Sequence, residues 1–200
     1  MESTDKYELV LLSSRKLIEE IGFSALTMDK VAQKAGIAKG TLYLYFKDKN
    51  ELLEKVLGRG FEIMFERIKT RAGMQANCAE KLKAIITENI NYIHENRYFF
   101  KACFLDEVNI IFFKKTSQES VNSRRKRYAN FIGEIIKSGI ESGEFRHDLN
   151  PVKATYMLLA LIKTNVIYNF FNNTNELAEE VVKNDAEEIF SLLIHGINKA

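Results

Sequence analysis

Apolar side chains recur along most of this chain at the three- and four-residue spacing of amphipathic helices. Over residues 5–21 they fall on one helical face, and Gly22 follows where a C-terminal cap belongs. Two short helices are expected next, over residues 28–35 and 39–46, with Gly36 between them. The second short helix cannot persist alone, so packing of its apolar side chains against its neighbours must hold it.

Capping residues mark where several of the helices begin. Thr27 precedes the second helix, and its hydroxyl can accept a hydrogen bond from a free amide of the first turn. Asp48 followed by Glu51 reads as a capping box that opens a longer helix. Asn150-Pro151 is a further start signal, because proline at the first helical position loses no amide hydrogen bond. The helices expected after residue 48 cover residues 49–71, 79–96, 97–115, 118–142, 151–172 and 175–198.

The composition favours helices over strands. The 200 residues are 46% hydrophobic and 28% charged, as in a globular protein. A single proline and ten glycines leave little turn chemistry for β-hairpins. We therefore predict an all-α fold of about nine helices. A three-helix domain over residues 1–50 would precede a larger helical domain over residues 51–200.

Charge and cysteine content limit which partners and which cellular compartment we expect for this protein. The 29 basic residues nearly balance the 27 acidic ones, giving a net charge of +2, so any nucleic-acid binding must use a local patch. Cys78 and Cys103 are too few for a disulfide framework and lack C-x-x-C spacing, which fits a reducing compartment. No apolar stretch is long enough to span a bilayer. We expect a cytoplasmic protein with no membrane partner.

Residues 22–52 have the layout of a helix-turn-helix. Two short helices meet across a tight turn, and the second is crowded with lysine, threonine and tyrosine. Its buried seam would leave an outward surface sized for the major groove of DNA. The residues on that surface are Lys39, Gly40, Thr41, Tyr43 and Leu44.

The same segment carries short motifs at fixed spacing. They are Gly22-Phe23, Leu26-Thr27, Val31-Ala32, Ala35-Gly36 and Thr41-Leu42-Tyr43-Leu44-Tyr45-Phe46. This pattern resembles the DNA-binding domain of the tetracycline-repressor (TetR) family and covers about a quarter of the chain. The resemblance implies a C-terminal domain that forms a homodimer and holds an effector. That effector would move the helix at residues 49–71 and change the spacing of the two DNA-binding domains.

Each candidate DNA contact has a physical rationale. Thr27 and Lys49 lie at helix N-termini, where they can meet phosphate oxygens and position the protein. Lys39 can reach guanine acceptors, and Tyr43 can contact a thymine methyl group or a phosphate. Capping alone also explains Thr27. The candidate contacts with double-stranded operator DNA are Thr27, Lys39, Gly40, Thr41, Tyr43, Leu44, Tyr45 and Lys49.

The last two helices are candidates for a dimer interface. Apolar residues lie almost all round the helix at 151–171, so it must be covered on more than one side. The helix at 175–198 carries an apolar stripe. Two such helices from each subunit would form a four-helix contact about a twofold axis. A large monomeric core is the alternative, because the pattern does not say what covers these faces.

Aromatic residues of the C-terminal domain predict a pocket for an apolar or aromatic small molecule, although most aromatic side chains in such a domain are ordinary core. A fatty acyl group, a drug-like cation and a phenolic compound all remain open. The candidate pocket residues are Tyr92, Phe100, Phe104, Tyr128, Phe131, Tyr156 and Asn165.

The basic run at residues 124–127 is the other concentrated group of charges. On a helix its four cations point in different directions, so a solvated surface is favoured over a second nucleic-acid patch.

No arrangement of residues predicts catalysis, a metal site or a cofactor. His94, His147 and His195 lack metal-ligand spacing, and no phosphate-binding or nucleophile motif occurs. A lone E-x-x-H at residues 144–147 lacks the second copy that di-iron bundles need. The sequence predicts an effector-responsive transcriptional regulator, most simply a repressor of a palindromic operator. A small-molecule binding module with an inactive DNA-binding domain is the alternative.

Overall fold

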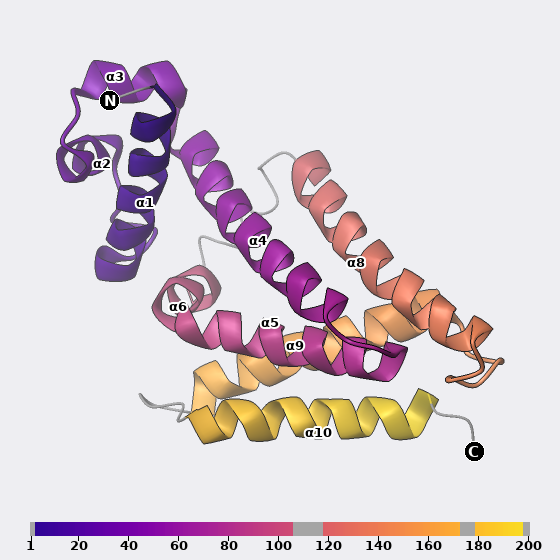
Figure 1. The fold of residues 1–200 in the computed structure, drawn as a ribbon. Coiled ribbons are helices and arrows are strands. Elements are labelled where there is room, and N and C mark those ends of the chain that lie inside the picture. The colour runs from indigo at the N-terminus through magenta and orange to yellow at the C-terminus, as the bar shows by residue number, and fades with distance from the viewer. Residues whose placement is uncertain (1–2, 106–117, 173–178, 198–200) are drawn as a thin grey trace. The chain divides into compact units, whose positions relative to one another are not determined.

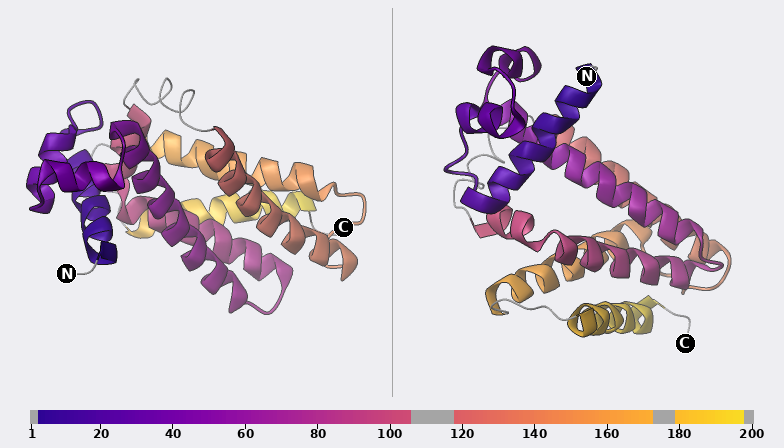
Figure 2. Two further views of the ribbon diagram at one scale, coloured as in Figure 1. Left: turned by 90° about the horizontal axis from the view of Figure 1, so that it is seen from above. Right: turned by 60° about the vertical axis from the view of Figure 1, so that its left-hand side comes forward.

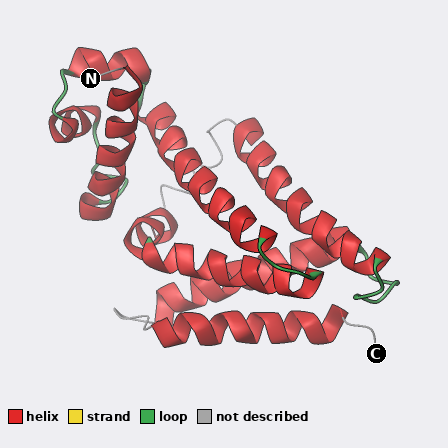
Figure 3. Cartoon of the chain, in the orientation of Figure 1, coloured by secondary structure: helices red, strands yellow, loops and turns green. Residues whose placement is uncertain are grey.

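The computed structural model describes residues 3–105, 118–172 and 179–197, and the elements described there are helices joined by loops (Figure 1, Figure 3). The predicted all-α fold is confirmed. The sequence predicts a helix over residues 97–115, and the part of it that follows Leu105 lies outside the described residues. The helices are α1 (Ser3–Ile21), α2 (Met28–Ala35), α3 (Lys39–Tyr45), α4 (Lys49–Gly73), α5 (Cys78–Glu95), α6 (Arg97–Leu105), α8 (Gln118–Glu141), α9 (Pro151–Asn172) and α10 (Glu179–Ile197).

The chain divides into two compact units. Unit 1 comprises residues 1–63 and 96–121, and unit 2 comprises residues 64–95 and 122–200. Helix α4 contributes its first part to unit 1 and its last part to unit 2. Helix α6 belongs to unit 1, where it packs against α1. The division by function at residues 50 and 51 stays a prediction.

Unit 1 holds the three N-terminal helices around one apolar core. The short helix α3 is anchored by Leu42 and by Phe46, which directly follows it, and both side chains are fully buried. Tyr7 of α1 stacks on Phe46, with 5.2 Å between ring centroids. Because α3 is too short to persist alone, these contacts supply the stability that its own backbone lacks. The central core residues are Val10, Ile18, Phe23, Leu26, Val31, Leu42, Phe46 and Leu52.

The predicted caps of the helix-turn-helix are present. The hydroxyl of Thr27 accepts a hydrogen bond from the amide of Lys30 at 3.3 Å. Gly36 ends α2 in the left-handed conformation, with φ of 65°, and its amide donates to carbonyls of the last turn. Asp48 accepts from the amide of Glu51 at 2.9 Å, whereas the Glu51 carboxylate reaches the amide of Lys47 rather than that of Asp48. One hydrogen bond of the predicted capping box is therefore present, and the other goes to the amide one residue before the expected one.

Unit 2 is built around α5, with α9 and α10 lying beside it and beside each other (Figure 1, Figure 2). Leu82, Ile85 and Ile86 of α5 are fully buried. The carboxylate of Glu144, half of the lone E-x-x-H, accepts hydrogen bonds from the amides of Cys78 and Ala79 at 2.9 and 2.7 Å. It therefore caps α5 from a distant part of the chain.

A charge cluster joins α5 to the last part of α4 inside unit 2. Arg67 Nε donates to the buried carboxylate of Glu88 at 2.6 Å, and the rest of its guanidinium binds Glu95 in bidentate fashion at 2.6 and 3.0 Å. The hydrogen bond to Arg67 lowers the pKa of Glu95 below its ordinary value. Arg67 therefore neutralises the buried carboxylate of Glu88.

Candidate nucleic-acid interface

One face of α3 is displayed to solvent and carries side chains that can contact DNA. Each helical residue advances by about 100°, so Gly40 and Leu44 lie opposite the buried Leu42. Leu44 is 83% exposed, and Tyr43 beside it is 45% exposed. The apolar surface of an exposed leucine and of a tyrosine ring is unfavourable in water, whereas base edges and thymine methyl groups offer it contact area. The structure therefore brings Gly40, Tyr43 and Leu44 to one outward surface, as the sequence predicts.

Lys39 lies on one edge of this surface and already has a partner. Its Nζ is 2.6 Å from Oδ1 of Asp29 in α2, and both side chains are more than half exposed. The hydrogen bond to Asp29 raises the pKa of Lys39 above its ordinary value. An ion pair this exposed is worth little in water, so Lys39 can exchange Asp29 for a base or a phosphate.

Thr41 and Tyr45 lie on the opposite edge and are half-buried. The ring of Tyr45 packs edge-on against Tyr7 of α1, with 6.1 Å between centroids. Tyr45 therefore helps to fix α3 against α1. Its contact with DNA stays a prediction.

The two residues assigned to phosphate both have structural roles. Thr27 is exposed, and its hydroxyl oxygen caps α2 while its own hydrogen remains able to donate to a phosphate. Lys49 donates from Nζ to the carbonyl of Phe23 at 2.7 Å and to that of Ser24 at 3.3 Å. This bond ties the start of α4 to the loop after α1. Sequence reasoning missed it because 25 and 26 residues separate the partners.

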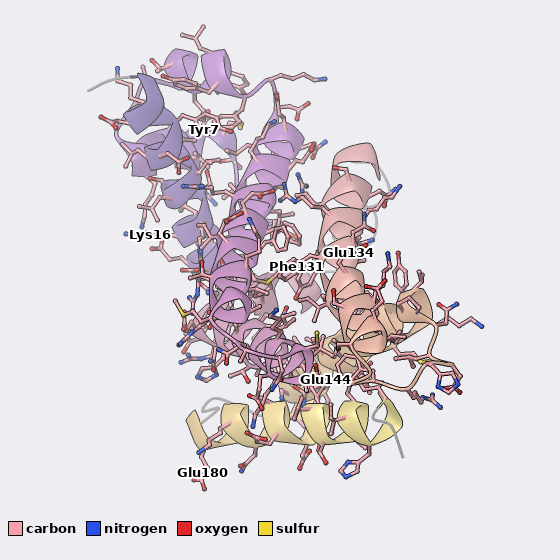
Figure 4. All side chains as sticks on the ribbon, turned by 45° about the vertical axis from the view of Figure 1, so that its right-hand side comes forward. Tyr7, Lys16, Phe131, Glu134, Glu144 and Glu180 are labelled. Carbon is pink, nitrogen blue, oxygen red and sulfur yellow. The ribbon has the colours of Figure 1, made fainter. Side chains whose placement is uncertain are left out.

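Part of the candidate effector pocket comes together in unit 2. Tyr128 and Phe131 of α8 both pack edge-on against Phe65 of α4, with centroid distances of 5.5 and 5.6 Å, and Figure 4 shows Phe131 between the two helices. Asn89 donates a short hydrogen bond to the Tyr128 hydroxyl, and burial raises the pKa of that phenol. The guanidinium of Arg127 lies 5.0 Å from the Phe65 centroid. One member of the basic run therefore covers an aromatic ring rather than only facing solvent.

The other candidate pocket residues are dispersed. Tyr92 is buried, Phe100 packs in unit 1, and the Phe104 side chain lies outside the described residues. Tyr156 is 60% exposed on α9, and Asn165 accepts a hydrogen bond from Asn169 at 3.3 Å. The described residues thus gather Tyr128 and Phe131 into one aromatic group, and the assignment of all seven residues to an effector pocket stays a prediction.

Two negative findings apply to the described residues alone. No group of three or more histidine, cysteine or acidic side chains in residues 3–105, 118–172 and 179–197 is arranged to hold a metal ion. Across the same part of the chain, none of the helices has the length and apolarity needed to span a membrane.

Two family comparisons agree with this architecture. Residues 10–56 match the family described as bacterial regulatory proteins, tetR family. Residues 75–193 match the family described as tetracyclin repressor-like, C-terminal domain. The chain therefore belongs to the TetR family of transcriptional regulators, which combine a helix-turn-helix DNA-binding domain with a ligand-binding domain.

Among the individual relatives are proteins named as regulators of fatty acid metabolism or degradation. The fatty acid metabolism regulator protein of Bacillus subtilis strain 168 is 27% identical over 163 residues, which are 80% of this chain and 81% of that protein. The structure of the fatty acid degradation regulator FadR from Bacillus halodurans has a TM-score of 0.81 at 21% identity, covering 98% of both chains. FadR from Bacillus subtilis in complex with stearoyl-CoA has a TM-score of 0.80 at 24% identity, covering 96% of this chain and 100% of that one. At these identities the structural likeness establishes the shared fold.

Proposed function

We propose that this protein is a homodimeric, effector-responsive repressor that places α3 of each protomer in successive major grooves of a palindromic operator. The observation that carries the proposal is the outward face of α3, where Tyr43 and Leu44 are exposed on a helix whose other side closes a core. In a twofold dimer the two helices would read half-sites about 34 Å apart. Effector binding would then change the spacing of the two α3 helices.

The exposed face of α9 supports a dimer, because it carries four large apolar side chains beside Lys153 and Lys163. Val152, Tyr156, Met157 and Tyr168 are 62, 60, 65 and 61% exposed. Steps of about 100° per residue place all four on the same half of the helix. Exposed apolar groups along one helix face indicate a protein contact. A second copy of this chain, packed in a twofold arrangement, would cover the face.

Replacing Met157 by aspartate is expected to raise the dimer dissociation constant at least about tenfold, because a carboxylate would be desolvated in an apolar contact. Sedimentation velocity over a dilution series measures this. Met74→Asp is the matched control, since Met74 is 69% exposed but directly follows α4 and is not part of α9. A Met157→Asp protein that dimerises like wild type would remove α9 from the interface. A wild-type monomer at all concentrations would favour the single-core alternative.

A long-chain acyl thioester is the effector class that we infer. Support comes from the names of the relatives, from the stearoyl-CoA bound to the Bacillus subtilis neighbour and from the apolar group around Phe65, Tyr128 and Phe131. The drug-like cation and the phenolic compound remain as the comparison ligands. At a free concentration of 100 times its dissociation constant, the true effector would add about 2.7 kcal/mol to folding stability.

The deciding experiment measures binding of the purified protein to the DNA upstream of its own gene and to a scrambled duplex at one salt concentration. We expect a selective shift with the upstream DNA. Stearoyl-CoA is expected to reverse the shift, and coenzyme A alone is not. A selective shift that resists stearoyl-CoA would contradict the effector class. Equal, weak binding to both duplexes would instead favour a binding module with an inactive DNA-binding domain.

A further inference from the structure

A hollow of about 460 Å³ lies in unit 1 beside α3. It is bounded by the start of α1 and by the turn that joins α2 to α3. Lys6 and Leu9 contribute from α1, Gly36 and Ala38 contribute from the turn, and Thr41 contributes from α3. A lysine and a threonine therefore line one hollow at an edge of the surface proposed to enter the major groove.

Lys6 and Lys47 differ from three other cations around this surface, because neither has an ion-pair partner among the residues that the structure describes. Lys34 pairs with Glu20 and Lys39 pairs with Asp29, while Lys49 binds two carbonyl groups. Lys6 is half-buried, and it has no ion-pair partner among the residues that the structure describes. A half-buried lysine whose ammonium has no ion-pair partner within the described residues favours binding of an anion.

The position of Lys6 matches what a helix in the major groove must meet. The groove is about 12 Å wide, so a helix inside it has a phosphate backbone along each side. The ion pair between Lys39 and Asp29 places the first turn of α2 along one edge of α3. The hollow places Lys6 along the other edge, beside Thr41. The first edge holds the predicted phosphate contact Thr27, and the α3 residues on the second edge, Thr41 and Tyr45, are uncharged.

We propose that Lys6 is a DNA-contacting residue that binds a backbone phosphate at the Thr41 edge of α3. The phosphate would enter the hollow, where its oxygens would accept hydrogen bonds from the Lys6 ammonium and the Thr41 hydroxyl. This assignment rests on the proposed binding of α3 to DNA. It also assigns Thr41 to phosphate binding. Lys6 lies before the residues 10–56 that match the family, so that match does not include it.

The test compares wild type with Lys6→Gln, Lys6→Arg and Lys16→Gln. Lys16 is exposed on the same helix, about 15 Å further along at 1.5 Å per residue. Figure 4 labels it away from Tyr7, the neighbour of Lys6. Fluorescence anisotropy with a random-sequence duplex of about 30 base pairs, titrated between about 50 and 200 mM salt, gives the slope of log affinity against log salt.

We expect Lys6→Gln to reduce the magnitude of that slope by about 0.9 for each bound protomer. Lys6→Arg is expected to restore the wild-type slope, and Lys16→Gln is expected to leave it unchanged. Thermal unfolding followed by circular dichroism should be the same for all four proteins, because Lys6 makes no ion pair within the described residues. The affinity loss should be equal on the upstream DNA and on a scrambled duplex, because a phosphate carries no sequence information.

The outcomes separate this inference from the proposed function. If wild type binds DNA and Lys6→Gln has the wild-type salt slope, the assignment of Lys6 is overturned while DNA binding by α3 stands. If wild type binds no DNA, the proposed function itself fails. A second arm adds inorganic phosphate and follows the melting temperature. Phosphate that stabilises wild type but not Lys6→Gln, together with unchanged DNA slopes, would assign the hollow to a free anion and overturn the DNA contact.

Discussion

Tyr43→Ala is expected to weaken operator binding about 100-fold while the protein stays folded and dimeric. The Tyr43 ring is 45% exposed on the outward face of α3, so its removal leaves no cavity in unit 1. A lost contact to a base edge costs about 1 to 3 kcal/mol, and a dimer on a palindrome loses two such contacts. A loss near the lower end of that range at both half-sites gives about two orders of magnitude.

Anisotropy titrations on the upstream DNA and on a scrambled duplex, at one salt concentration, measure this loss. Tyr98→Ala is the matched control, because Tyr98 is 59% exposed in the same unit but belongs to α6. A loss confined to the upstream DNA identifies Tyr43 as a base-reading residue. An equal loss on both duplexes would identify a phosphate contact, and an unchanged affinity would remove α3 as the reading helix.

The helix-turn-helix was predictable because its determinants are local in sequence. Thr27 caps α2 through an amide three residues away, and Gly36 ends the same helix through carbonyls three and four residues back. Such bonds depend only on residue type and short spacing. The outward positions of Tyr43 and Leu44 follow equally directly, since the buried Leu42 fixes the rotation of α3.

The contacts that sequence reasoning missed join residues distant in the chain. Glu144 caps α5 across 65 and 66 residues, and Arg67 reaches Glu95 across 28. Nothing in the local pattern around residue 144 specifies its partners, and its E-x-x-H spacing points to a different chemistry. Aromatic residues show the same limit. Phe100 and Tyr156 have the residue types of a pocket wall, but the first packs in unit 1 and the second lies exposed on α9.

The two predicted interfaces differ in how much support the structure adds. The DNA-binding face is complete within one unit, because α1, α2 and α3 supply both its core and its edges. The dimer face requires a second copy, and one chain shows only that apolar residues of α9 remain exposed. Residue patterns predict burial well, but they do not distinguish burial inside one chain from burial between two.

Two glycines of α8 give the second large prediction, in which the same substitution has opposite effects. A β-carbon on Gly139 would lie 2.3 Å from Cδ2 and Cε2 of Phe145 and 3.1 Å from Cβ of Cys78. A β-carbon on Gly133 would have Thr155 Oγ1 at 3.4 Å as its nearest neighbour, which is an ordinary contact. There is no room for a methyl group at Gly139, whereas there is room for one at Gly133.

Gly139→Ala is expected to destabilise unit 2 by about 3 kcal/mol, at the upper end of the cost of overpacking a core. The Phe145 ring is 1% exposed, and its amide donates to the carbonyl of Gly139 at 2.9 Å. The hydrogen bond holds the Phe145 ring against α8, so neither the ring nor the helix can move apart without a large loss of stability. Gly133→Ala is expected to stabilise the protein by about 0.5 to 1 kcal/mol, because alanine loses less backbone entropy in a helix.

Urea unfolding followed by circular dichroism at fixed protein concentration measures both changes. If the 200-residue chain unfolds in one transition, a loss of 3 kcal/mol corresponds to a fall of roughly 6 to 12 °C in melting temperature. If Gly139→Ala were as stable as wild type, the close packing of Phe145 on α8 would be wrong. If Gly133→Ala were equally destabilised, the effect would belong to α8 as a whole rather than to the contact at Gly139. Opposite signs would place the tight contact where the backbone of α8 meets Phe145.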